Sequence, residues 1–82
     1  MSQNKQFNCY YREGCHLCEE MTAALVMLQK KMDFKVHYFD IDESTLLYNQ
    51  YNTQVPVLET VNGELICLYF FDNTAFLACF ND

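Results

Sequence analysis

The fold is decided by the stretch Tyr10-Tyr11-Arg12-Glu13-Gly14-Cys15-His16-Leu17-Cys18, which carries the chain through a glycine-containing turn. Before the turn, Phe7-Asn8-Cys9-Tyr10-Tyr11 is a run of β-prone residues that predicts a strand. After it, apolar residues recur at steps of three and four, as on one face of a helix; they are Leu17, Met21, Ala24, Leu25, Leu28 and Met32. The pattern predicts a helix from about residue 15 to residue 32, with Lys30 and Lys31 in its last turn.

A second strand and a short second helix follow. Residues 34–39 read Phe-Lys-Val-His-Tyr-Phe and predict a strand, with Val36, Tyr38 and Phe39 as core contacts. Asp42-Glu43-Ser44 offers side chains that cap helices, so a helix is expected from there to about Asn52. Because a helix connects the first two strands, they should be parallel with a right-handed crossover.

The last third of the chain predicts a hairpin and a final helix. Val55-Pro56-Val57-Leu58 resumes the strand pattern, and Asn62-Gly63 is a strong hairpin signal that joins residues 57–61 to residues 64–69. Asp72-Asn73 can cap a last short helix. The predicted order is β-α-β-α-β-β-α, an α/β fold with a four-stranded mixed sheet flanked by helices, and residues 1–82 form one domain.

Composition and charge exclude several classes of protein. A chain that is 51% hydrophobic folds into a globule rather than staying disordered, and a net charge of −6 argues against binding to nucleic acid. The longest apolar run, residues 65–71, is too short to cross a bilayer. The polar residues 1–6 lack the apolar stretch of a signal peptide. We therefore expect a cytoplasmic monomer whose cysteines are kept reduced.

The pair Cys15 and Cys18 carries the chemistry. Unpaired backbone N–H groups at the start of a helix stabilise an anion, and the thiolate is the nucleophile of thiol–disulfide exchange. Residues three apart on a helix have Cβ atoms about 5–6 Å apart, close to the span of a disulfide. Cys15 can therefore attack a substrate disulfide, and Cys18 can then attack Cys15 and release the product.

Two other interpretations of the pair stay open. Cys15, His16, Cys18 and Cys67 could bind a metal ion, although no second Cys-x-x-Cys pair is present to complete a typical zinc site. The pair could also be purely structural. The other three cysteines stand alone within apolar runs, where cysteine commonly fills the core. The adjoining β-α-β pattern favours redox chemistry.

The stretch from Tyr10 to Cys18, together with Gln54-Val55-Pro56, resembles the glutaredoxins. More narrowly, it is similar to small bacterial glutaredoxin-like proteins that carry a C-H-L-C type of motif and a V-P-V-L strand. The resemblance extends from about residue 5 to residue 80 and implies the thioredoxin fold. It also implies a thiol–disulfide oxidoreductase with no bound cofactor or metal, which acts on protein or small-molecule disulfides, with glutathione as a candidate.

The same resemblance assigns roles to further residues. Arg12 stands three residues before Cys15, where glutaredoxins place a basic residue that supports the thiolate and attracts glutathione. Pro56 matches the cis-proline of the family, beside which Val55 would offer its backbone to an extended peptide. Gln54 stands where the family has threonine, and Asp72 matches an acidic residue that meets an amino group of the ligand.

The sequence departs from typical glutaredoxins in two places. His16 and Leu17 replace the proline and tyrosine between the cysteines, and a cationic His16 would further favour the thiolate. The Gly-Gly pair that lets glutathione approach the backbone is absent, and Ile66-Cys67-Leu68-Tyr69 stands in that region. We therefore expect a crowded groove and weak dependence on glutathione.

Two alternatives to an enzyme follow from these departures. A binding module of the same fold without turnover is one, and exposed Tyr69 and Phe70 at the expected groove would favour it. A protein that handles a metal or an iron–sulfur cluster is the other.

Overall fold

The strands and helices follow one another in the predicted order. The computed structural model describes residues 5–81, so the polar residues 1–4 and residue 82 lie outside the described part. The strands are β1 (Lys5–Tyr11), β2 (Phe34–Asp40), β3 (Val57–Thr60) and β4 (Leu65–Leu68). The helices are α1 (His16–Gln29), α2 (Thr45–Tyr51) and α3 (Asn73–Phe80), and a 3-10 turn, η1 (Ile41–Glu43), precedes α2.

The four strands form one sheet in the order β2-β1-β3-β4. Strands β1 and β2 are parallel, from Lys5 opposite Phe34 to Tyr11 opposite Asp40. The pairs β1–β3 and β3–β4 are antiparallel. The predicted α/β fold with a mixed four-stranded sheet is therefore confirmed.

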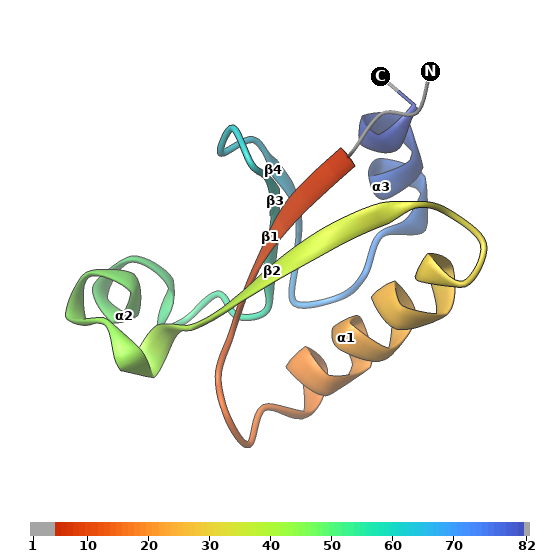
Figure 1. Cartoon of the computed structure of the whole chain (residues 1–82). Coiled ribbons are helices and arrows are strands. Elements are labelled where there is room, and N and C mark those ends of the chain that lie inside the picture. The colour runs from red at the N-terminus through yellow and green to blue at the C-terminus, as the bar shows by residue number, and fades with distance from the viewer. Residues whose placement is uncertain (1–4, 82) are drawn as a thin grey trace.

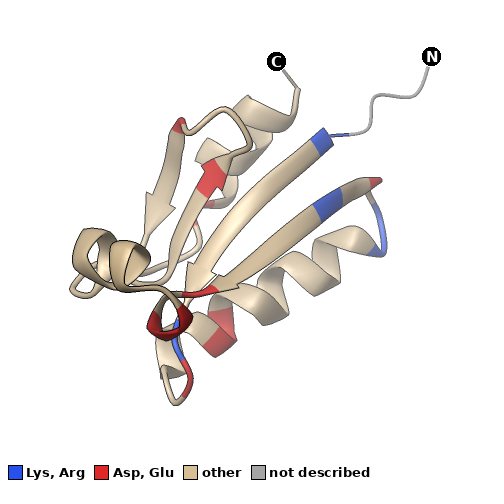
Figure 2. Cartoon of the chain, turned by 60° about the vertical axis from the view of Figure 1, so that its left-hand side comes forward, with Lys and Arg blue, Asp and Glu red and all other residues tan. Residues whose placement is uncertain are grey.

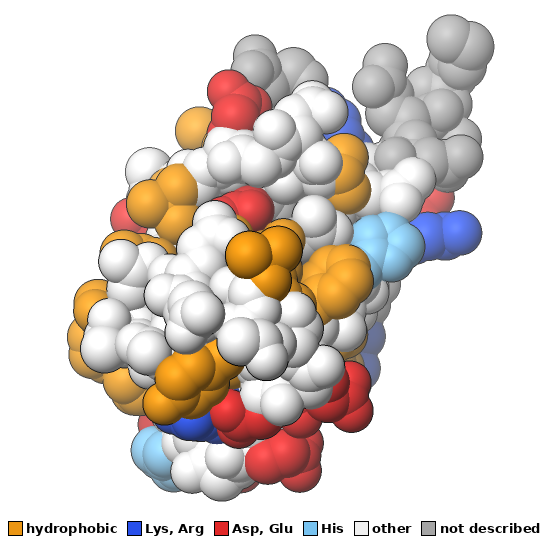
Figure 3. Space-filling view, turned by 90° about the vertical axis from the view of Figure 1, so that its left-hand side faces the viewer, with side chains coloured by type: hydrophobic (Ala, Val, Ile, Leu, Met, Phe, Trp, Pro, Cys, Tyr) orange, Lys and Arg blue, Asp and Glu red, His pale blue; other side chains and the backbone are white. Residues whose placement is uncertain are grey.

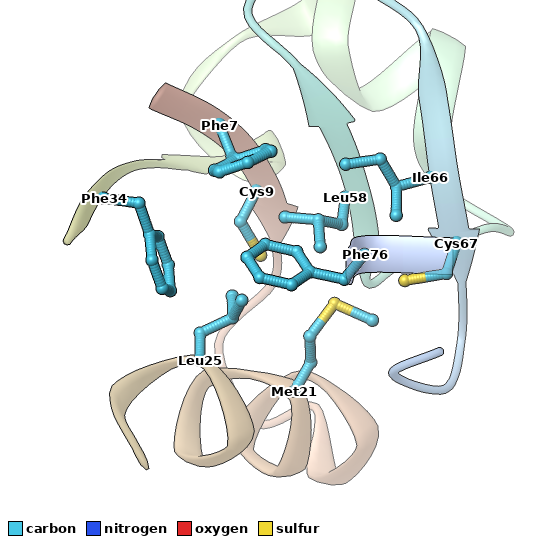
Figure 4. Close-up of a cluster of buried hydrophobic side chains, with 9 residues drawn as sticks. All are labelled: Phe7, Cys9, Met21, Leu25, Phe34, Leu58, Ile66, Cys67 and Phe76. Atoms are coloured by element: carbon cyan, nitrogen blue, oxygen red, sulfur yellow. The ribbon is translucent and has the colours of Figure 1, made fainter. Parts of the chain in front are cut away.

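Helices α1 and α3 cover one face of the sheet, and α2 packs at one end of the other face (Figure 1). Alternate residues of β1 serve these two faces, as the pleat of a strand requires: Phe7 and Cys9 point toward α1 and α3, and Tyr10 points toward α2. Figure 4 shows the larger core cluster, whose members are Phe7, Cys9, Met21, Leu25, Phe34, Leu58, Ile66, Cys67 and Phe76. None of the helices within residues 5–81 is long and apolar enough to span a membrane.

A smaller core cluster holds α2 against the sheet. It consists of Ile41, Tyr51 and Val57, and the ring of Tyr51 stacks on that of Tyr10 with centroids 4.4 Å apart. Ser44 begins α2, because its hydroxyl accepts a hydrogen bond from the N–H of Leu47 at 3.3 Å. The capping predicted for this segment therefore rests on Ser44.

Helix α1 begins where the sequence predicted and ends earlier. Its last residue is Gln29 rather than residue 32, so Lys30 is the C-cap and Lys31 lies beyond the helix. The backbone N–H groups of Lys31 and Met32 both bond to the carbonyl of Leu28 at 2.9 Å. Because of this tight turn, Met32 still packs against the core. Its spacing from the apolar residues of α1 therefore resembles one more helical turn.

The hairpin is shorter than predicted and contains a bulge. Leu58 lies opposite Cys67, but Glu59 lies opposite Leu65, so Ile66 is an extra residue in β4. As a result, the neighbours Ile66 and Cys67 both pack into the larger core cluster, whereas regular alternation would direct them to opposite faces of the sheet. At the turn, Gly63 adopts a positive φ of 92°, a conformation that favours glycine.

The prediction that Tyr38 and Phe39 are core contacts was wrong. Their exposed fractions are 40% and 39%, because β2 is an edge strand of the sheet. Each ring packs on a neighbour in β1 instead: Phe39 stacks on Tyr10, and Tyr38 meets Tyr11 edge-on. Val36 does pack against the larger core cluster.

Candidate active site

Cys15 and Cys18 form a disulfide at the start of α1, directly after the turn that follows β1. Their Cα atoms are 5.2 Å apart, which is within the range that a disulfide spans. The two sulfurs differ in access: Cys18 is only 3% exposed, whereas Cys15 is partly exposed. A substrate that approaches from outside therefore meets Cys15 first.

The helix start also supplies a hydrogen bond to Cys15. Cys15 is the N-cap of α1, and its Sγ accepts the backbone N–H of Cys18 at 3.1 Å. Gly14 turns the chain into this position with a positive φ of 75°. An N–H donor and the positive end of a helix both favour a thiolate, so the geometry suits a nucleophilic sulfur at Cys15.

Arg12 lies in the same turn, and its guanidinium contacts Asp42 and Tyr48. Its Nε and Nη2 donate to Asp42 Oδ2 and Oδ1 at 3.0 and 2.9 Å, and its guanidinium lies 5.2 Å from the centre of the Tyr48 ring. The hydrogen bonds from Arg12 hold the pKa of the Asp42 carboxyl below its usual range. Much of the positive charge predicted to face the cysteine pair is therefore balanced by Asp42.

Asp42 was missed as a partner of Arg12, although the topology offers a signal. The residues are 30 positions apart in the sequence, and the local pattern around Asp42 indicates only a helix cap. Since β1 and β2 are parallel, their carboxyl ends meet at one edge of the sheet, with Arg12 after one strand and Asp42 after the other.

His16 points away from the disulfide toward the next turn of α1. Its side chain is 82% exposed, and its Nε2 lies 2.8 Å from Glu20 Oε2. Asp72 is also engaged within its own element, because its Oδ1 accepts the N–H of Ala75 at 3.0 Å and caps α3. His16 therefore lies at the start of α1, and Asp72 lies at the start of α3.

The Val55–Pro56 peptide bond is cis. Pro56 is buried, and the side chain of Gln54 is exposed. Gln54 donates its backbone N–H to the Tyr51 carbonyl at 2.9 Å, whereas the N–H and C=O of Val55 have no hydrogen-bond partner within residues 5–81. Val55 therefore offers a free donor and a free acceptor just before β3 begins.

Tyr69 connects the Pro56 segment to the region beside α1. Its backbone N–H donates to the Pro56 carbonyl, and its hydroxyl donates to the Thr53 carbonyl, each at 2.9 Å. Tyr69 adopts a positive φ of 64°, which is uncommon for a residue with a side chain. Sequence reasoning did not identify this role, because nothing in the local pattern indicates a tyrosine in that conformation.

A groove separates the first turns of α1 from the segment after β4. Its walls are Leu17, Glu20 and Met21 on one side and Tyr69, Phe70 and Phe71 on the other, and its volume is about 260 Å³. Leu17 lies between the two cysteines in the sequence, so the groove reaches the first turn of α1, although neither cysteine lines it. A second hollow, of about 350 Å³, lies on the other side of α1, where Arg12, Gly14 and Cys18 line it.

The comparisons with known proteins agree with this site. The model of the family described as Glutaredoxin-like domain (DUF836) matches residues 8–78. The chain belongs to the glutaredoxin-like family. No curated protein matches this glutaredoxin-like chain.

Two solved structures of similar proteins share the glutaredoxin-like architecture. The solution structure of Protein Ne2328 from Nitrosomonas europaea is 40% identical over 96% of this chain and 94% of that one, with a TM-score of 0.83. The X-ray structure of the structural genomics target protein XcR50 from X. campestris is 25% identical over 92% and 95% of the two chains, with a TM-score of 0.65. The predicted thioredoxin fold and the predicted family are both confirmed.

The remaining cysteines of the glutaredoxin-like domain differ from the redox pair. Cys9 is fully buried, and burial, reinforced by the nearby Cys67, raises the pKa of its thiol to about 12. Burial also raises the pKa of Cys67. Among residues 5–81, no three His, Cys, Asp or Glu side chains gather as a metal site would require, so the ligand set with Cys67 is not assembled.

Charge is divided between the two ends of this glutaredoxin-like protein (Figure 2). The lysines lie at the end where β1 and β2 begin and α1 finishes: Lys5, Lys30, Lys31 and Lys35. Acidic residues gather at the end that carries the disulfide: Glu13, Glu19, Glu20, Asp40, Asp42 and Glu43. Figure 3 shows the same gathering along the lower edge of the α2 face. The site therefore lies in a negative field despite the presence of Arg12.

Proposed function

We propose that this protein is a thiol–disulfide oxidoreductase in which Cys15 is the nucleophile and Cys18 the resolving cysteine. One observation carries the proposal: the two cysteines are paired at a helix start, with Cys15 reachable from outside and Cys18 buried behind it. Such a pair can open and close while the surrounding fold stays in place.

The exchange has two steps. The Cys15 thiolate attacks one sulfur of a substrate disulfide, which forms a mixed disulfide and releases the first substrate thiolate. Cys18, deprotonated, then attacks Cys15 Sγ, and the second substrate thiolate leaves. The substrate gains two electrons and two protons, and the Cys15–Cys18 dithiol becomes the disulfide that the structure contains.

The other predicted site residues have supporting roles in this proposal. Arg12 contributes a positive charge that Asp42 weakens, and His16, which lies against Glu20, is a candidate helper at the start of the same helix. Val55 and Pro56 shape the surface that meets the substrate, with the free backbone groups of Val55 available for strand addition to an extended substrate. Gln54, one residue before Val55, and Asp72, one residue after Phe71, are candidate substrate contacts.

We also propose the setting in which the protein acts. Residues 1–82 form a single domain that works as a monomer in the cytoplasm, where the reducing environment regenerates the dithiol. Its substrates are protein or small-molecule disulfides, and it needs no bound cofactor or metal.

The test is single-turnover reduction of bis(2-hydroxyethyl) disulfide by the pre-reduced protein. Cys15→Ser should abolish the reaction, and Cys18→Ser should stop it at a mixed disulfide on Cys15 that mass spectrometry detects. Cys79→Ser is the matched control, because Cys79 is a free cysteine at the edge of the core, and it should react like the wild type. Exchange that persists in Cys15→Ser would refute the proposal.

A binding module without turnover is the second candidate, and the exposed Tyr69 and Phe70 favour it. In that case the reduced wild-type protein would leave the small disulfide intact. The same experiment therefore separates the two functions.

A further inference from the structure

We propose that the groove between α1 and the Tyr69–Phe71 segment selects a polypeptide disulfide whose cysteine is flanked by a bulky apolar residue and a basic residue. This inference rests on the proposed exchange at Cys15 and names the class of substrate. The occupant is an extended cationic segment of another protein rather than glutathione.

One wall of the groove is aromatic, and the other combines Leu17 and Met21 with the carboxylate of Glu20. Phe70 is 67% exposed and Tyr69 is 39% exposed, and both stand opposite Leu17 and Met21. The volume of about 260 Å³ is below the roughly 300–1,000 Å³ of small-molecule sites, so it suits one side chain of a longer ligand. An aromatic or large aliphatic side chain would cover Phe70 and remove apolar surface from water.

The groove is held open by fixed contacts. The two hydrogen bonds of Tyr69 tie it to the carbonyls of Thr53 and Pro56, so this wall is braced against the segment that carries Val55. A peptide paired with the free N–H and C=O of Val55 would run alongside Tyr69. Because successive side chains of an extended peptide point to opposite sides, a residue next to the substrate cysteine can reach the groove while the cysteine faces Cys15.

The charge of the surface around the groove indicates which charge the substrate should carry. Glu20 lines the groove, Asp72 follows Phe71 directly, and Glu13 and Glu19 lie on the same end of the molecule. Among residues 5–81, Arg12 is the only lysine or arginine at this end, and it is paired with Asp42. A Lys or Arg in the substrate would be attracted here, whereas anionic glutathione would be repelled.

Glutathione also lacks the apolar side chain that the groove would hold. It carries carboxylates, and its remaining residues are glycine and a γ-linked glutamate. Two independent features, the aromatic wall and the acidic rim, therefore favour the same polypeptide substrate over glutathione.

The experiment compares symmetric disulfide dimers of blocked peptides, so that attack on either sulfur is equivalent. The peptides contain Lys-Phe-Cys, Lys-Ala-Cys or Glu-Phe-Cys, and glutathione disulfide is the fourth substrate. Single-turnover rates of the pre-reduced protein are measured by acid quench and chromatography at low salt. Each rate is divided by the rate of the same disulfide with dithiothreitol, which removes differences in intrinsic reactivity.

We expect the Lys-Phe-Cys dimer to react about five- to tenfold faster than the Lys-Ala-Cys dimer, as partial burial of one aromatic side chain predicts. It should also react several-fold faster than the Glu-Phe-Cys dimer, and added salt should shrink this second ratio. Phe70→Ala should bring the first ratio close to one, and Glu20→Gln should reduce the second. Leu46→Ala is the matched control, because Leu46 is 75% exposed on α2, and it should change neither ratio.

The outcomes separate this inference from the proposed function. If the wild-type protein fails to reduce bis(2-hydroxyethyl) disulfide, the proposed function itself is wrong. If that disulfide is reduced but the peptide dimers react at equal rates, or glutathione disulfide reacts fastest, the selective groove is wrong. A Phe preference that survives in Phe70→Ala, with a native circular dichroism spectrum, also overturns it.

Discussion

In the fully reduced protein, Cys15 should react with iodoacetamide long before Cys9, because only Cys15 is both reachable and placed to form a thiolate. The perturbation is a short exposure to limiting reagent at pH 7, followed by digestion and mass-spectrometric mapping of all five cysteines. Since the thiolate is the reactive species, the magnitude follows from the fraction of each thiol that is ionised.

The contrast with Cys9 can be worked out. A thiol with a pKa of about 12 is ionised to roughly one part in 100,000 at pH 7, whereas an ordinary thiol of pKa about 8.5 is ionised to about 3%. The more basic thiolate is intrinsically more nucleophilic by about 25- to 55-fold, given a Brønsted slope of roughly 0.4–0.5. Cys9 should therefore react at least about fifty-fold more slowly than an ordinary exposed thiol, before its complete burial is counted.

The helix start should make the contrast between Cys9 and Cys15 larger still. Unfolding in guanidinium is the control, because it should bring the five rates to within a few-fold of one another. Equal labelling of all five cysteines in the folded protein would refute the reasoning. After reoxidation, the same mapping should find one disulfide, Cys15–Cys18; a bridge that includes Cys67 or Cys79 would contradict the geometry.

Three further outcomes follow from the packing and the ion pair. Phe76→Ala should lower the free energy of unfolding by about 3–5 kcal/mol in a denaturant titration, because Phe76 is fully buried; Leu46→Ala, an exposed counterpart, should change it little. Ser44→Ala should cost about 1 kcal/mol in the same assay, and Ser44→Gly only a few tenths, because Ser44 caps α2. Asp42→Asn should lower the melting temperature above about pH 4, where the Asp42 carboxylate is ionised and pairs with Arg12. Since Arg12 depresses the pKa of Asp42, this stabilisation should fade as pH falls through the lowered value, and a constant difference down to pH 2 would contradict it.

The layers of the fold were predictable because they depend on local patterns. The apolar spacing from Leu17 to Met32 indicates α1, and Asn62-Gly63 indicates the hairpin between β3 and β4. The cysteine pair was equally visible, since it stands where the glycine turn ends and the apolar helical pattern begins. These features involve residues within one or two turns of each other.

The features that were missed depend on contacts between distant segments. The bulge that buries both Ile66 and Cys67 is set by packing against the core, so the sequence alternation could not indicate it. The pairing of Arg12 with Asp42 requires the register of β1 against β2. The bracing role of Tyr69 requires the positions of the Thr53 and Pro56 carbonyls, which no local pattern contains.

The positions at which the described part of the chain begins and ends have a practical consequence. Lys5 at the start of β1 and Cys79 near the end of α3 line one hollow beside the hairpin turn, at the opposite end of the molecule from the turn before α1 (Figure 1). A tag or linker attached at either end would therefore anchor the protein to a bead or an electrode with its redox pair directed outward. Immobilised in this way, a Cys18→Ser variant could retain its substrates covalently without hindrance from the support.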